Sequence, residues 1–173
     1  ASSSPSTVES WTDPMKTLVV GLGNPVLSDD AVGWRVVAEL RSRFGGREDI
    51  DLERCCRGGL DLMEMMVGYD RAVIVDAVTS GARPGTVRQM STDDVPTRHS
   101  TSAHDASLPS ALALGRQLGA HLPAPEDVLL VAVEAADTLN FSEECTPQVE
   151  AAIPEAVAVL AEALGREARS LQP

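Results

Sequence analysis

The stretch from Val20 to Gly33, VGLGNPVLSDDAVG, organises the rest of the chain. The run just before it, Thr17 to Val20, is apolar and rich in β-branched residues, which is the pattern of a buried strand. After it, apolar residues recur at helical spacing from Ala31 to Phe44. The stretch therefore predicts a strand, a tight glycine turn and the start of a helix.

Three polar residues, Ser28, Asp29 and Asp30, stand at the predicted start of this helix. Their side-chain oxygens can accept the free amide protons of the first turn, and negative charge suits the helix dipole there. Two adjacent carboxylates are more than capping requires, so we expect at least one of them to serve chemistry. We assign that role to Asp30.

The length and composition predict one domain with an aliphatic core. The chain has 173 residues, of which 43% are hydrophobic and only 3% aromatic, so the core must be built from Val, Leu, Ala and Met. Residues 1–15 are rich in Ser, Thr and Pro and are expected to be a flexible tail. The single α/β domain is predicted over residues 16–165, and residues 166–173 form a charged C-terminal tail.

The charge balance excludes several classes of partner. Acidic residues outnumber basic ones by 26 to 14, giving a net charge of −12. Such a field repels nucleic acid phosphates and anionic membranes, so we expect neither as a partner. No apolar run is long enough to cross a bilayer, and the start of the chain lacks the features of a signal peptide. Three cysteines do not suggest a disulfide framework, which favours a reduced, cytoplasmic location.

Strands and helices alternate along the remaining chain. The run Ala72–Val78 is unbroken and apolar, as in a parallel strand covered on both faces, whereas 85–90 alternates like an edge strand, for which an antiparallel direction is open. An acidic loop is expected from Glu134 to Cys145. The pattern predicts a three-layer α/β/α sandwich around a twisted, mostly parallel five-stranded sheet. Further strands are predicted at 50–56 and 128–133, and further helices at 60–67, 105–118 and 147 to about 164.

The topology of such a sheet brings two acids together. Binding sites in open α/β sheets form beyond the carboxyl ends of the strands, where the strand order reverses. In a flavodoxin-like order the first and third strands are neighbours at this point. Asp30 follows the first strand and Asp76 lies at the end of the third. We therefore expect both carboxylates in one crevice, where they could share a proton or bind a cation.

The glycine turn does not match the known nucleotide-binding motifs. Gly21-Leu22-Gly23 lacks the third glycine of a dinucleotide fingerprint, and no Lys-Ser or Lys-Thr pair follows as in a P-loop. The acids at the helix start would also repel a pyrophosphate. A nucleotide site is therefore disfavoured.

A histidine could complete a metal site with the two acids. His104 stands just before the helix predicted from about residue 105. A lone histidine there is more often a cap or a surface residue, and an acid at a strand end often caps the following loop. Together, Asp30, Asp76 and His104 would form an oxygen, oxygen, nitrogen set suited to nickel, zinc or cadmium. Three protein ligands would leave positions open for water or for groups of a substrate.

Several motifs, in this order, resemble the hydrogenase maturation proteases. The glycine-asparagine turn with its acidic pair and following glycine, the strand that ends in Asp-Ala, the histidine at the head of a helix and the loop before the final helix all match that family. These motifs are Gly21–Asn24 with Asp29, Asp30 and Gly33, then Val73–Ala77, Ser102–Asp105, and the loop from Val133–Ala135 to Thr146–Glu150. The resemblance extends from Lys16 to about Leu164.

The resemblance implies a function and a partner. Members of the family are endopeptidases that remove the C-terminal extension of the nickel-iron hydrogenase large subunit. It implies that Asp30, Asp76 and His104 contact nickel that belongs to the substrate precursor, a site that zinc or cadmium can also occupy. Asp30 and Asp76 are then the catalytic candidates, in either an aspartic or a metal-assisted mechanism. Many members carry Glu where this chain has Asp30.

Two other interpretations of the sequence stay open at this stage. The segment Val19–Pro25 also resembles the start of bacterial peptidyl-tRNA hydrolase, but the Thr-Arg-His-Asn box of that family does not follow it. The most similar segment, Thr97–Ser100, comes some seventy residues too late. The net charge of −12 also argues against binding of tRNA. A non-catalytic module that binds nickel or the precursor through the same three residues is the other alternative.

Overall fold

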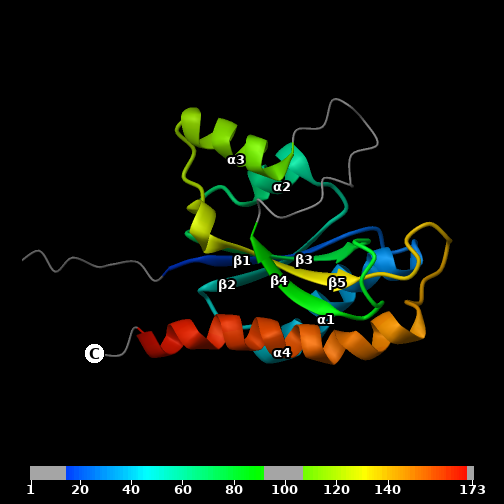
Figure 1. The fold of residues 1–173 in the computed structure, drawn as a ribbon. Coiled ribbons are helices and arrows are strands. Elements are labelled where there is room, and N and C mark those ends of the chain that lie inside the picture. Colours follow the sequence, from blue (N-terminus) through cyan, green and yellow to red (C-terminus); the bar gives the residue numbers. More distant parts are fainter. Residues whose placement is uncertain (1–14, 92–106, 171–173) are drawn as a thin grey trace, which may run out of the picture.

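A five-stranded sheet forms the centre of the computed structural model, which describes residues 15–91 and 107–170 (Figure 1). Its strands lie in the spatial order β2-β1-β3-β5-β4. The strands are β1 (Thr17–Leu22), β2 (Ile50–Cys55), β3 (Arg71–Val78), β4 (Val87–Ser91) and β5 (Val128–Glu134). The α-helices of the described residues are α1 (Val32–Phe44), α2 (Gly59–Met65), α3 (Leu108–Gln117) and α4 (Pro147–Ser170).

The directions of the strands confirm the predicted mostly parallel sheet. β1 pairs in parallel with β2 on one side and with β3 on the other, and β3 pairs in parallel with β5. Only the edge strand β4 runs antiparallel, against β5. The first and third strands are therefore neighbours, as the flavodoxin-like order predicted. Their register places Val20 opposite Ile74 and Gly21 opposite Val75.

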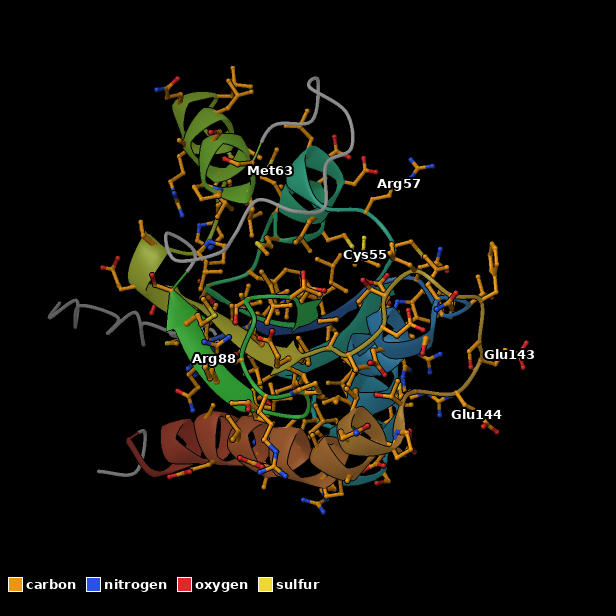
Figure 2. All side chains as sticks on the ribbon, turned by 45° about the vertical axis from the view of Figure 1, so that its right-hand side comes forward. Cys55, Arg57, Met63, Arg88, Glu143 and Glu144 are labelled. Atoms are coloured by element: carbon orange, nitrogen blue, oxygen red, sulfur yellow. The ribbon has the colours of Figure 1, made fainter. Side chains whose placement is uncertain are left out.

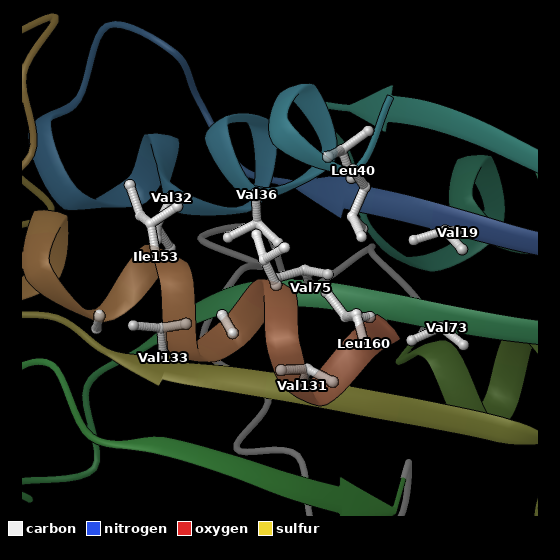
Figure 3. Packing of buried hydrophobic residues seen from close by; sticks show 14 of the residues in the cluster. Val19, Val32, Val36, Leu40, Val73, Val75, Val131, Val133, Ile153 and Leu160 are labelled. Atoms are coloured by element: carbon white, nitrogen blue, oxygen red, sulfur yellow. The ribbon is translucent and has the colours of Figure 1, made fainter. Parts of the chain in front are cut away.

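Helices cover both faces of the sheet, α1 and α4 on one side and α2 and α3 on the other (Figure 1). Successive residues of a strand point to opposite faces, so each inner strand contributes to both layers of core. Val73 and Val75 of β3 pack toward α1 and α4, as Figure 3 shows, whereas Ala72 and Ile74 pack toward α2 and α3. This burial on two faces explains the unbroken apolar run of β3.

Proline positions set two helix starts as predicted. α3 begins at Leu108, with Ser107 as its N-cap and Pro109 in its first turn, where proline needs no amide partner. α4 begins at Pro147 and continues through Pro154. It ends at Ser170, beyond the predicted end near residue 164. Residues 105 and 106, where the third helix was predicted to begin, lie outside the described residues, and the domain boundaries stay predictions.

Glu134 lies in a different environment from the one that the sequence suggested. It was predicted to open an acidic loop, but it is the last residue of β5, pairs in register with Val78 and is only 1% exposed. Its carboxylate accepts hydrogen bonds from the amides of Ser80 (2.7 Å) and Gly81 (2.8 Å). The Ser80 hydroxyl (2.6 Å) and the Arg88 guanidinium (3.0 Å) donate as well. These donors compensate the buried charge, which lets the strand run one residue further.

Two further features bear on membrane association and on disulfide bonding. No helix in the described part of the chain is both long and apolar enough to cross a membrane. Cys55, Cys56 and Cys145 are all free thiols. The cytoplasmic location stays a prediction.

Candidate active site

The glycines of the opening motif allow three backbones to pack unusually closely. A Cβ on Gly21 would lie 2.2 Å from the carbonyl oxygen of Gly33, and one on Gly33 would lie 2.4 Å from that of Val75. Gly23 has a φ of +131°, and its Cβ would meet the carbonyl oxygen of Asp30 at 1.8 Å. Only glycine fits such sites, because any side chain would collide with backbone. The motif therefore seats the turn and the start of α1 directly against β1 and β3.

Asp29 is fully buried and holds a distant loop. Its carboxylate accepts hydrogen bonds from the amides of Ala136 (2.8 Å), Asp137 (2.9 Å) and Thr146 (2.6 Å), and from the Thr146 hydroxyl (3.0 Å). The prediction that the acids cap the helix was wrong. A short 3₁₀ helix, η1 (Ser28–Ala31), precedes α1, and neither helix has a side-chain cap. The acid binds amides of another segment because that loop lies against the turn.

The loop held by Asp29 comprises residues 135–146 and is attached at further points. The Ser28 amide donates to the carbonyl of Ser142 (2.9 Å), close to the middle of the loop. From α1, the guanidinium of Arg35 donates to the carbonyl of Glu143. The loop therefore shares its framework with the turn that carries the two aspartates.

Asp30 lies beside Asp29 but faces the glycine turn. It is 9% exposed, and its Oδ2 accepts a hydrogen bond from the amide of Asn24 at 2.7 Å. Its own amide donates to the carbonyl of Leu27 (2.9 Å), which closes the turn. η1 packs against β3 as well as against α1, so Asp30 is carried on an element in contact with the strand of Asp76.

Asp76 lies in β3, one residue past the last position paired with β1, and is 2% exposed. Alternation along the strand directs it to the same face as Ile74 and Val78, which pack toward α2 and α3. The adjacency of β1 and β3, on which the predicted meeting of Asp30 and Asp76 depends, is confirmed. The catalytic and metal-binding roles of the two acids stay predictions.

His104, the third residue of the predicted site, lies outside the described residues. The helix that follows it can be oriented. Beyond the C-terminal end of α3, the His121 carbonyl accepts a hydrogen bond from the Gly68 amide (2.9 Å), just before β3 begins. The start of α3 therefore lies toward the C-terminal ends of the parallel strands (Figure 1). Asp76 is near the C-terminal end of one of these strands, β3. Within residues 15–91 and 107–170, no three His, Cys, Asp or Glu side chains cluster as a metal site.

Glu134 is the residue near the site that the sequence reasoning missed. Burial raises the pKa of its carboxyl, but the hydrogen bonds from Ser80 and Gly81 and the charge of Arg88 outweigh burial and lower the pKa below its ordinary value. Arg88 reaches across from the edge strand β4 (Figure 2). The Glu134 carboxylate thus holds Ser80 and Gly81, in the segment that follows β3. An acid at the end of an unbroken apolar run was the signal that selected Asp76, and it applies equally to Glu134.

One buried acid in the turn after β1 and another near the end of the adjacent parallel strand β3 define this chain as an α/β protein with a two-acid candidate site. Comparison with known proteins names the family. The family model described as hydrogenase maturation protease, HycI, matches residues 34–163. The chain belongs to the hydrogenase maturation protease family. The match covers most of the chain, whereas the likeness to peptidyl-tRNA hydrolase is confined to Val19–Pro25.

Individual relatives agree with this assignment. The chain is 31% identical over 146 residues to the hydrogenase 2 maturation protease of Escherichia coli K12, covering 83% of this chain and 87% of that protein. It is 29% identical over 157 residues to the hydrogenase expression/formation protein HupD of Thiocapsa roseopersicina, covering 89% and 69%. Among solved structures, the hydrogenase maturating endopeptidase HybD from E. coli superimposes with a TM-score of 0.71 at 30% identity, covering 88% of this chain and 94% of that one. The maturation protease HycI from Thermococcus kodakarensis shares the fold, with a TM-score of 0.65 at 20% identity, covering 89% and 95%.

Proposed function

We propose that this hydrogenase maturation endopeptidase removes the C-terminal extension of the precursor of a nickel-iron hydrogenase large subunit, and that it recognises nickel already loaded into that precursor. The observation that carries the proposal is the placement of two buried carboxylates on neighbouring strands, Asp30 in the turn after β1 and Asp76 near the end of β3. Membership of the maturation protease family supplies the class of reaction.

The proposed ligands of the substrate nickel are Asp30, Asp76 and His104. Carboxylate oxygens and one imidazole nitrogen suit a divalent ion of borderline softness. His104 comes before α3 in the sequence, and the start of α3 lies toward Asp76. This orientation of the helix supports the inclusion of His104. With three ligands from the enzyme, the remaining positions on the ion stay with the precursor, so the nickel holds the scissile bond beside these three residues.

The chemistry required is the attack of water on a peptide carbonyl. A carboxylate near this bond can take a proton from the water and return it to the departing amine. In a metal-assisted version the nickel of the precursor polarises the water or the carbonyl. Asp30 and Asp76 both qualify as the base. Burial of both acids keeps bulk water from competing with the positioned one.

The direct test mixes the purified protein with nickel-loaded and nickel-free precursor and follows the mass of the large subunit. We expect the mass of the extension to be lost only from the loaded precursor. Equal cleavage of both forms would refute nickel recognition. Binding of the loaded precursor without any change in its mass would replace the enzyme by a binding module.

Asp76→Asn tests the site within the same assay. We expect loss of cleavage with an unchanged circular dichroism spectrum, because the amide cannot act as a base or as a strong ligand. Glu155→Gln is the matched control, since Glu155 is an exposed acid on α4 and its neutralisation should leave cleavage unchanged. Full activity of Asp76→Asn would remove this residue from the site.

A further inference from the structure

The loop of residues 135–146 presents two large apolar side chains to solvent. Phe141 is 86% exposed and Leu139 is 84% exposed, the highest values among the large hydrophobic residues that the structure describes. The whole sequence has only two phenylalanines. The other, Phe44, packs against the core at the end of α1. One of the few aromatic side chains of the protein therefore stands at the tip of a loop.

The tip of this loop is an ordered turn. Oδ1 of Asp137 accepts hydrogen bonds from the amides of Leu139 (3.0 Å) and Asn140 (3.1 Å), and Oδ2 accepts one from the Asn140 side chain (2.8 Å). These bonds hold the pKa of Asp137 below its ordinary value. At its two ends the loop is fixed by Asp29. The apolar side chains are thus displayed from a pre-organised element, which lowers the entropy lost when a partner binds.

Acidic side chains border the apolar tip. Glu143 and Glu144 are exposed and point outward from the loop (Figure 2), and Asp137 lies at its other end. An apolar pair flanked by carboxylates complements an apolar pocket bordered by basic side chains. A second copy of this chain fits less well, because a two-fold contact would bring the same acids of two proteins, each of charge −12, together.

We propose that loop 135–146 is the docking element for the precursor, with Leu139 and Phe141 entering an apolar pocket that basic side chains surround. The inference rests on the proposed function and adds the surface by which the substrate is held. Asp29 binds the loop and is adjacent to Asp30, so a polypeptide seated on the tip lies against the turn of the candidate site. Binding remote from the reacting bond then brings that bond to the carboxylates.

The test measures cleavage of purified, nickel-loaded precursor by Leu139→Ala, Phe141→Ala and the double variant. We expect the KM of the double variant to rise roughly tenfold or more, as for apolar anchors at interfaces, with kcat unchanged. The melting temperature should stay the same, because both side chains are exposed. Leu118→Ala is the control, since Leu118 is 78% exposed but follows α3 near the start of β3, whereas the loop follows the end of β5, and its KM should not change.

Charge reversal tests the basic border of the pocket. Glu143→Lys combined with Glu144→Lys should raise KM and reduce its dependence on salt, because a favourable long-range attraction is removed. A lower KM in this variant would overturn the assignment of a basic partner.

Other outcomes separate this inference from the proposed function. If the wild-type protein does not cleave the precursor, the proposed function fails. The docking element is then tested by titration calorimetry, which compares the affinities of the wild type and the double variant for the same precursor. If cleavage occurs and the KM of the double variant is unchanged, the docking element is refuted while the function stands. A wild-type dimer in sedimentation that the double variant converts to monomers, with KM unchanged, would show that a second copy occupies the tip.

Discussion

Asp29 and Thr146, which are 117 positions apart in the chain, are joined by two hydrogen bonds: the Thr146 amide donates to Oδ1 at 2.6 Å and its hydroxyl to Oδ2 at 3.0 Å. This contact ties the turn after β1 to the residue before α4. The two adjacent acids therefore have different roles: Asp29 binds the loop of residues 135–146 to the turn that carries Asp30, whereas Asp30 is the candidate for chemistry.

We expect Asp29→Asn to lower the free energy of unfolding by about 2–4 kcal/mol. The side-chain amide has one acceptor oxygen in place of two, and its NH₂ group would face backbone amides that are themselves donors. Urea denaturation measures the change. Thr146→Val removes only the hydroxyl bond and should cost about 1 kcal/mol. Equal losses in both variants would show that the charge of Asp29 contributes nothing.

Asp30→Asn should reduce kcat/KM for the precursor by roughly 10²-fold or more while the fold stays intact. Its Asn24 contact can persist through the amide oxygen, so the effect should fall on activity rather than stability. Asp30→Glu keeps a carboxylate at this position, one methylene further from the backbone, and should retain part of the activity that Asp30→Asn loses. An Asn variant as active as the Glu variant would exclude Asp30 as a base or a ligand.

Glu134 should make stability depend on pH in the acid range. Its folded pKa lies below the ordinary value of 4.5, so the ionised group stabilises the fold above pH 4.5 and loses this contribution as pH falls through the folded pKa. Glu134→Gln should therefore be less stable than the wild type by about 2 kcal/mol near neutral pH. The difference should shrink below pH 4.5.

Urea titrations of the wild type and Glu134→Gln at several pH values measure this convergence. Ser80→Ala is the control, because it removes one donor and keeps the carboxylate, so its pH dependence should persist in weaker form. A constant difference between Glu134→Gln and the wild type at all pH values would contradict the lowered pKa.

Gly33→Ala should destabilise the protein by about 3 kcal/mol, because its Cβ would lie 2.4 Å from the Val75 carbonyl oxygen and the backbone cannot yield without moving α1. Gly165→Ala is the matched substitution: this glycine lies in α4, is exposed, and has nothing within 4 Å of the added carbon. It should raise stability by about 0.5–1 kcal/mol through helix propensity. Thermal unfolding distinguishes the two, and a tolerated Gly33→Ala would refute the close packing of α1 on β3.

Much of the fold could be predicted from local patterns. The unbroken apolar run of β3 indicated burial on two faces, and Pro109 and Pro147 marked helix starts, because proline fits the first turn, where its missing amide proton has no partner to lose. The expected strand order correctly made β1 and β3 neighbours, with Asp30 after the first and Asp76 near the end of the second. The error at Glu134 arose because an acid after an apolar run equally suits a loop, and the hydrogen-bond donors to its carboxylate come from residues 46 to 54 positions away.

The sequence by itself determined the strands and helices, the direction of most strands, and the positions of one acid after β1 and one near the end of β3, because hydrophobic periodicity, proline and glycine act over a few residues. Only the tertiary structure decided that Asp29 holds loop 135–146 instead of capping α1, and that Leu139 is displayed at the tip of that loop. A carboxylate binds whichever amides lie within reach, and the fold alone sets which segments distant in the chain bring theirs to it.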